Sequence, residues 1–144
     1  MTFSTAAVTL WLAVATGEMT PLVVQAPDSP VRLDHVQLLT GADAPPVLLY
    51  AATNVSTDDL DQFTVIAFVF SADGRLKARQ VAPGRRMLEA KNSKFSTLVL
   101  DGSPLEPTDL IVVGVNQAQK ASSETWWRAD LQERALDAAK RKKP

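Results

Sequence analysis

The sequence contains no cysteine, and this absence excludes a whole group of structures and activities. Without thiols there is no disulfide framework, no zinc–thiolate or iron–sulfur site and no thiol nucleophile. Histidine is almost absent as well, because His35 is the only one in the chain. No second imidazole is therefore present to join it in a metal site.

An excess of either charge is also lacking. Fifteen Lys and Arg residues stand against sixteen Asp and Glu residues, which gives a formal net charge of −1. A dedicated nucleic-acid-binding domain normally carries a basic field, so this class of function is excluded. What the chain does have is 46% hydrophobic residues over 144 positions, enough for one globular domain with a core.

The first part of the chain lacks charge altogether. Residues 1–17 hold no charged side chain, and residues 6–15 are largely apolar. Ala13-Val14-Ala15 has the small-x-small form of a signal-peptidase site, although the basic residue expected before the apolar run is missing. The run is shorter than the roughly 20 residues that span a bilayer. A cleaved signal peptide, a retained anchor and a buried N-terminal strand or helix all remain open. We expect a periplasmic or otherwise extracytoplasmic protein, with association to a membrane as an alternative.

Prolines and a change in composition divide the rest of the chain. Pro21, Pro27 and Pro30 interrupt the sequence that follows the apolar leader, so residues 20–30 are predicted to be an extended linker. The predicted divisions are a leader and linker over 1–30, a β-sandwich over 31–120, and a helix with a basic tail over 121–144.

Short apolar runs separated by turn residues dominate the central part. The runs that we predict to be strands are 31–38, 47–55, 62–70, 75–82, 94–100 and 110–118. Strands of this length, with turn signals between them, are typical of a sandwich. The sequence therefore predicts an all-β, Ig-like antiparallel β-sandwich with a C-terminal α-helix.

The strand predicted over residues 62–70 is apolar on both faces. One face carries Phe63, Val65, Ala67 and Val69, and the other carries Ile66, Phe68 and Phe70 together with Thr64. A strand with one face in water should show polar residues on that face. Some other element or a partner must therefore cover the second face.

A tight turn is predicted directly after this strand. Asp73-Gly74 lies between two strand patterns, and this dipeptide is the strongest short-range signal for a two-residue hairpin. The strand predicted next begins at Arg75.

The last segment changes from β-branched residues to helix-forming ones. Residues 125–144 are rich in Ala, Leu, Glu, Arg and Lys, and Trp127, Leu131, Ala135 and Ala138 fall on one helical face. We expect this helix, which Trp126 and Trp127 would begin, to cover the second face of the doubly apolar strand.

The stretch LLYAATNVSTDDLDQFTVIAFVFSADGRLKA, followed later by KFSTLVLDG, resembles small bacterial Ig-like β-sandwich domains, the FxLYD-like group among them. In such domains a strand ending in Asn-x-Ser leads to an apolar strand that closes in Phe-Asp-x-x-Gly. The corresponding residues here are Phe70-Ser71-Ala72-Asp73-Gly74, and the resemblance covers about residues 45–115. It implies a sandwich fold and an extracytoplasmic, non-catalytic role.

Candidates for catalysis or metal binding are few. Asp58, Asp59 and Asp61 are close in sequence, and a fold that brought Asp73 to them would gather four carboxylates of the kind that bind calcium. The ligand series of an EF-hand is missing, however. A solvated acidic turn is the expectation. No Gly-x-Ser-x-Gly elbow is present. We therefore expect no metal, no cofactor and no enzymatic activity, with a hydrolase of unfamiliar site as the weaker alternative.

The triplet Asn54-Val55-Ser56 matches the N-glycosylation sequon. Asn and Ser at the end of a strand are also common turn residues, and we expect that turn role here.

Interaction is the remaining role, and two groups of residues are candidates for it. Arg75, Lys77 and Arg79 are spaced to share one strand face. This face is expected to be an ordinary solvated one, and a docking surface for an acidic partner or anionic lipid is the alternative. The adjacent indoles Trp126 and Trp127 are residues of a type enriched in binding hot spots. The last candidates are the apolar side chains on the second face of the strand: Ile66, Phe68 and Phe70. They would contact a partner if no other element of the chain covered them.

Two function classes follow from these observations. The first is a non-catalytic extracytoplasmic binding or assembly module that acts through protein–protein contacts. The second is an accessory subunit of a membrane protein complex that retains its N-terminal apolar segment and touches the membrane surface peripherally.

Overall fold

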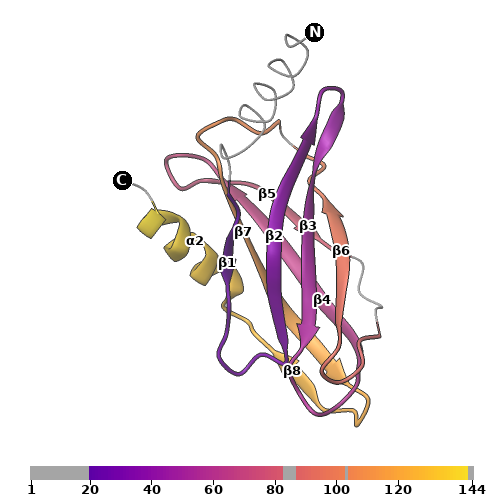
Figure 1. Cartoon of the computed structure of the whole chain (residues 1–144). Helices are drawn as coiled ribbons and strands as arrows, with labels where there is room; N and C mark the ends of the chain where they lie inside the picture. The colour runs from indigo at the N-terminus through magenta and orange to yellow at the C-terminus, as the bar shows by residue number, and fades with distance from the viewer. Residues whose placement is uncertain (1–19, 83–86, 103, 143–144) are drawn as a thin grey trace, which may run out of the picture.

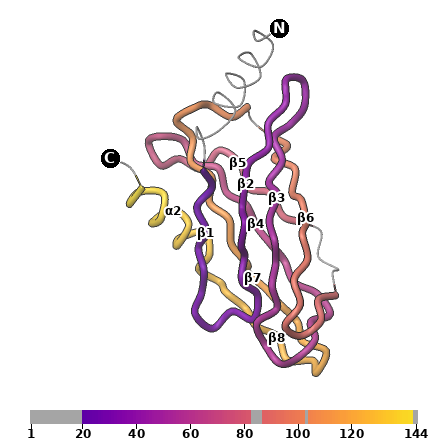
Figure 2. Tube along the Cα trace, in the orientation of Figure 1, coloured from indigo at the N-terminus to yellow at the C-terminus, as the bar shows by residue number. Residues whose placement is uncertain are grey.

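The computed structural model describes residues 20–82, 87–102 and 104–142, and these form eight strands and one helix. The strands build two sheets that face each other (Figures 1 and 2). The smaller sheet has the order β2 (Val31–Gly41), β3 (Ala44–Asn54), β6 (Ser93–Val99). The larger has the order β1 (Leu22–Val24), β7 (Leu110–Lys120), β4 (Leu60–Phe70), β5 (Leu76–Val81), with β8 (Thr125–Trp127) also paired to β7. The predicted all-β sandwich with a C-terminal helix is confirmed.

Strand β7 changes partners along one of its edges. Leu22 of β1 pairs with Val112 in parallel, whereas Trp127 of β8 pairs with Gln117 in antiparallel fashion. The change coincides with an irregularity at Asn116, which interrupts the pairing with β4 on the other edge. The larger sheet is thus mixed and not purely antiparallel, and part of the predicted linker, residues 22–24, is one of its strands.

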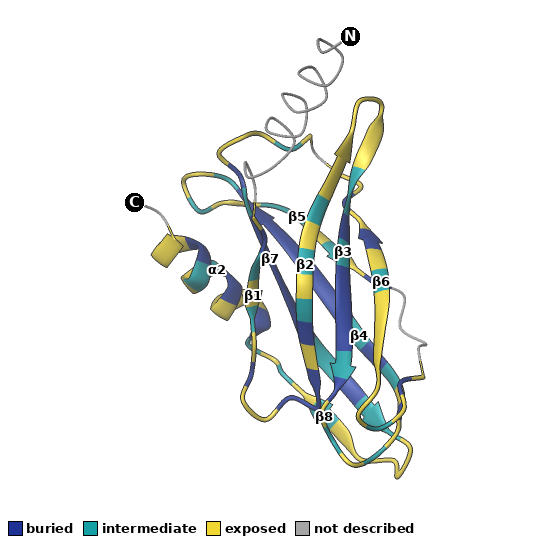
Figure 3. Ribbon diagram, in the orientation of Figure 1, coloured by how far each residue is buried: buried dark blue, intermediate teal, exposed yellow. Residues whose placement is uncertain are grey.

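The main core lies between the two sheets. Phe63, Val65, Ala67 and Val69 of β4 are buried there, as the alternation of the sequence predicts. Side chains of β3 meet them from the opposite sheet, Tyr50 among them. Figure 3 shows the buried residues running along β4 and β7 at the centre of the molecule.

The second face of β4 is covered by helix α2 (Leu131–Lys142). Its side chains Leu131, Ala135 and Ala139 form a separate buried cluster with side chains of the larger sheet: Ile66, Phe68, Phe70 and Val112. The prediction that the C-terminal helix covers this face of β4 is correct. The buried face of the helix includes Ala139 instead of the predicted Ala138, which is only half-buried.

The helix also begins later than predicted. Residues 125–127 pair with β7 as strand β8, so Trp126 and Trp127 do not begin the helix and do not cover β4. After Asn116, the edge of β7 that is not paired with β4 offers backbone donors and acceptors to residues 125–127. Pairing with this edge makes the segment a strand.

The hairpin between β4 and β5 is confirmed, but its loop has three residues instead of two. The backbone N–H of Ser71 donates to Arg75 O at 2.8 Å, and the N–H of Gly74 donates to Ser71 O at 2.9 Å. Gly74 has φ 88°, the left-handed conformation that glycine adopts without strain. A β-turn followed by a left-handed glycine is the usual three-residue hairpin loop.

Three connections between strands lie at one end of the sandwich. Since β1 and β7 begin where β4 ends, the pairings place the β4–β5 turn beside the starts of both strands. The β2–β3 turn and the β6–β7 connection lie at the same end, because β3 begins where β6 stops. We term this end the hairpin end (Figure 1).

Candidate functional site

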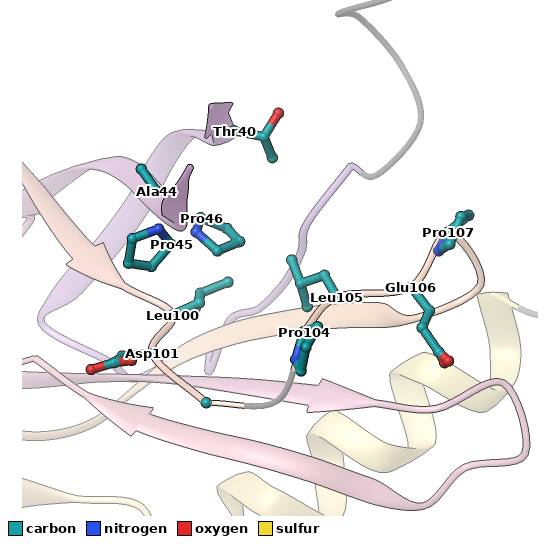
Figure 4. Close-up of a pocket in the computed structure, with 11 residues that line it drawn as sticks. Thr40, Ala44, Pro45, Pro46, Leu100, Asp101, Pro104, Leu105, Glu106 and Pro107 are labelled. Carbon is teal, nitrogen blue, oxygen red and sulfur yellow. The ribbon is translucent and has the colours of Figure 1, made fainter. Parts of the chain in front are cut away.

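A cleft of about 510 Å³ opens at the hairpin end, between the β2–β3 turn and the β6–β7 connection (Figure 4). Four of its lining residues are prolines, and we term it the proline cleft. Its lining consists of Thr40, Ala44, Pro45, Pro46, Leu100, Asp101, Gly102, Pro104, Leu105, Glu106 and Pro107.

The proline cleft is apolar at its floor. Leu100 is buried, and Leu105 packs against the main core, so the cleft is the open end of the space between the sheets. In Figure 4 these two leucines point towards Pro46 and into the cleft. Asp101 and Glu106 point away from the cleft. Prolines have no backbone N–H, so the walls have few donors to offer a ligand. The chemistry of the cleft favours an apolar group.

The loop that forms one wall is held by Asp109. Its carboxylate accepts the backbone N–H of Glu106 at 2.8 Å and the ammonium of Lys77 at 2.5 Å. Lys77 Nζ also donates to Pro104 O at 3.2 Å. The Asp109 side chain is 1% exposed and that of Lys77 is 12% exposed. These charge-assisted hydrogen bonds hold the described part of the wall, residues 104–109, in place.

A second apolar surface lies on the outer face of the smaller sheet. Leu39, Val47 and Val99 stand side by side on three neighbouring strands. Leu39 and Val99 are 45% and 44% exposed, and Phe95 further along β6 is 66% exposed. The ring of Phe95 lies 6.2 Å from that of His35. His35 is thus an exposed strand residue beside an aromatic ring, in agreement with a surface role.

The apolar residues predicted to meet a partner are not accessible. Ile66, Phe68 and Phe70 are 3%, 1% and 1% exposed, because α2 lies over them. They belong to the interior of the chain, and the prediction of a partner on this face is corrected.

The two indoles have different surroundings. Trp126 is half-buried, packs against the main core and donates its Nε1–H to Asp28 Oδ2 at 3.1 Å. Trp127 is 63% exposed and is the indole that remains available for contact. Successive strand residues point to opposite faces, which explains the difference.

The three cations predicted to share a face are separated by the structure. Arg75 lies in the hairpin turn, outside β5. An irregularity between β4 and β5 removes Lys77 from the alternation, and its ammonium reaches Asp109. Arg79 pairs with Phe68 and is exposed on the helix side of the sheet. The prediction of one basic strand face is wrong.

The aspartates considered for calcium do not converge. Asp58 and Asp59 precede β4, whereas Asp73 follows it at the far end of an 11-residue strand. Asp58 lies 3.5 Å from Lys120 Nζ, and Asp59 accepts the N–H of Ala90 at 2.9 Å. Among the described residues no three His or carboxylate groups gather as metal ligands do.

The sequon residue Asn54 has the predicted turn role. It is 0% exposed, its side-chain amide donates to Asp58 O at 2.8 Å, and its Oδ1 accepts the N–H of Ser56 at 3.0 Å.

Sequence reasoning missed the proline cleft. Its two walls come from the stretches TGADAPP and DGSPLEPTD, whose turn residues predict only connections between strands. Their shared signal is a pair of prolines in each loop, since rigid proline-containing loops at one end of a sandwich keep an opening in place.

Comparison with known proteins adds no assignment: no family model, no curated protein and no solved structure matches this chain. Within residues 20–82, 87–102 and 104–142, no helix has the length and apolar character needed to cross a membrane.

Proposed function

We propose that the chain is a non-catalytic binding module that acts outside the cytoplasm and holds an apolar segment of a partner protein in the proline cleft. The observation that carries this proposal is the cleft itself, an apolar opening of about 510 Å³ with an anchored wall. A volume in this range accommodates one or two large apolar side chains. The uncharged sequence over residues 1–17 supports the extracytoplasmic location.

The neighbouring surface supports a protein as the partner in place of a small molecule. Leu39 and Val99 precede the lining residues Thr40 and Leu100 in sequence, so an exposed apolar surface lies on the outer face of the sheet at the same end as the cleft. Contiguous exposed apolar surface marks interaction sites in proteins of this size.

Peptide selection against the full chain tests the proposal. Peptides enriched from a displayed random library should contain apolar side chains, and in NMR titrations their amide shifts should map to the β2–β3 turn and the β6–β7 connection. Ala44→Trp should abolish binding, because an indole placed at this exposed lining position fills the cleft.

Ala42→Trp is the matched control, since Ala42 is exposed in the same turn but does not line the cleft. It should bind the selected peptides as the parent chain does. Equal binding by both variants, or no enrichment of any peptide, would contradict the proposal.

A further inference from the structure

A cluster of cations forms where the β4–β5 turn meets the C-terminal end of α2. The two segments are distant in sequence, yet residues 71–74 and 139–140 line one hollow of about 100 Å³. A Cβ atom placed on Gly74 would lie 3.9 Å from Lys140 Cε. Arg75 directly follows Gly74 and closes the same turn, since its carbonyl accepts the N–H of Ser71. We term the resulting group, Arg75, Lys140, Arg141 and Lys142, the basic corner.

The basic corner has an excess of positive charge. All four side chains are exposed, and none forms an ion pair with a carboxylate of the described residues. The carboxylates nearest in sequence are Asp73 and Asp137, so four positive charges stand against two negative ones. The Asp73 carboxylate accepts the hydroxyl of Ser71, within its own turn. The cations are consequently available to an external anionic partner.

The chain enters the described fold beside this corner. Leu22 packs against the cluster beneath α2 and pairs with Val112, near the start of β7. Figures 1 and 2 show the start of β1, the β4–β5 turn and the last turn of α2 on the same side of the hairpin end. The uncharged residues 1–17 directly precede this point. The described chain therefore enters the fold beside the cationic surface.

We propose that the basic corner is a docking surface for an anionic lipid bilayer. Lys and Arg side chains near an anionic leaflet each strengthen binding by about fivefold. Stable attachment to a membrane usually takes two signals, such as an apolar anchor together with a basic patch. The basic corner supplies the basic patch, and the uncharged sequence of residues 1–17, which precedes β1 in the chain, supplies the apolar signal. A single membrane-facing end leaves the outer face of the smaller sheet free for other contacts.

Vesicle co-sedimentation of the full chain tests this proposal. The protein should bind vesicles of phosphatidylcholine mixed with phosphatidylglycerol more tightly than vesicles of phosphatidylcholine alone. Raising the ionic strength from about 0.1 M to about 1 M, which shortens the Debye length from about 10 Å to about 3 Å, should remove the difference. The triple variant Lys140→Gln, Arg141→Gln, Lys142→Gln should lose about a hundredfold in binding to the mixed vesicles.

A second triple variant, Arg32→Gln, Lys91→Gln, Lys94→Gln, controls for net charge. These three cations are exposed and lie at the opposite end of the sandwich, near the end of β3. It should bind the mixed vesicles as the parent chain does. Equal loss in both triple variants, equal binding to both vesicle types, or no binding at all would overturn the proposal.

Failure here is distinguishable from failure of the cleft proposal. The vesicle assay contains no peptide, and Ala44→Trp, which fills the proline cleft, should bind mixed vesicles unchanged.

Discussion

Lys77 and Asp109 form an ion pair of 2.5 Å that joins the edge strand β5 to the loop before β7. The carboxylate lies within the protein, whereas the lysine stem reaches it from the sheet edge. The pair connects two segments that are 32 residues apart in sequence. It is the contact that fixes one wall of the proline cleft.

Loss of this pair should destabilise the fold and loosen the cleft wall. Asp109→Ala leaves the Lys77 ammonium and the Glu106 N–H without their acceptor, which should cost about 2–3 kcal/mol in the free energy of unfolding. Denaturant unfolding measures the cost, and faster amide exchange over residues 104–109 should accompany it.

The matched control is Asp101→Ala, which removes an exposed carboxylate from the same connection. Its unfolding free energy should stay within about 0.5 kcal/mol of the parent value. If Asp109→Ala is equally mild, the ion pair does not hold the wall.

At Gly114, the helix and β1 both pack closely against β7. A Cβ atom there would lie 2.7 Å from Leu131 Cδ1 and 3.1 Å from Val24 O. Gly114→Ala should therefore destabilise the protein by about 1–3 kcal/mol, the usual cost of overpacking. Gly41→Ala is the control, because nothing lies within 4 Å of its Cβ position. Similar unfolding midpoints for the two variants would contradict the described packing of α2.

The two tryptophans should differ in their contribution to stability. Trp126→Ala removes a core contact and a hydrogen bond to Asp28, and should cost about 1–3 kcal/mol. Trp127→Ala should change the unfolding free energy by less than about 0.5 kcal/mol, since Trp127 is 63% exposed. Trp126→Phe keeps apolar contact but loses the donor, so it should cost about 1 kcal/mol. A larger effect at Trp127 than at Trp126 would refute this assignment.

Asp130, just before α2, should make stability depend on pH in the acid range. Its carboxylate accepts the Nε–H of Arg134 at 3.0 Å and that of Arg128 at 3.2 Å, and the hydrogen bond from Arg134 is the main cause that lowers the pKa of Asp130. A pKa lowered by folding means that the ionised group stabilises the fold above pH about 4, and this contribution is lost as the pH falls through the folded-state pKa.

Asp130→Asn should accordingly lower the urea midpoint at pH about 7 and lower it by less at pH about 3, where part of the ionic contribution has been lost. Asparagine keeps the size of the side chain and one acceptor oxygen but removes the charge and the second acceptor, so the dependence of its effect on pH reports the ionic contribution. Asp137→Asn, an exposed carboxylate on the same helix without an ion pair among the described residues, is the control. A deficit of Asp130→Asn that is the same at both pH values would argue against the ionic contribution.

Local pattern in the sequence determined the class of fold and the need for a third layer. The nearly continuous apolar run from Phe63 to Phe70 predicts two buried faces, and the structure assigns them to separate clusters. Glycine at position 74 likewise predicts the hairpin, because only its freedom at φ 88° suits the loop. These features depend on neighbours a few residues away, and so they can be read from the chain.

Pairing between segments distant in sequence determined strand β8, the position of Lys77 and both proposed sites. The Trp126-Trp127 segment forms a strand because a free edge of β7 is available, and no local signal reports that edge. The irregularity opposite Phe70 turns Lys77 towards Asp109, against the alternation that places it beside Arg75 and Arg79. The basic corner and the proline cleft exist only because segments distant in sequence meet at one end of the sandwich. Tertiary packing sets those meetings, since backbone hydrogen bonds and buried area outweigh local propensity.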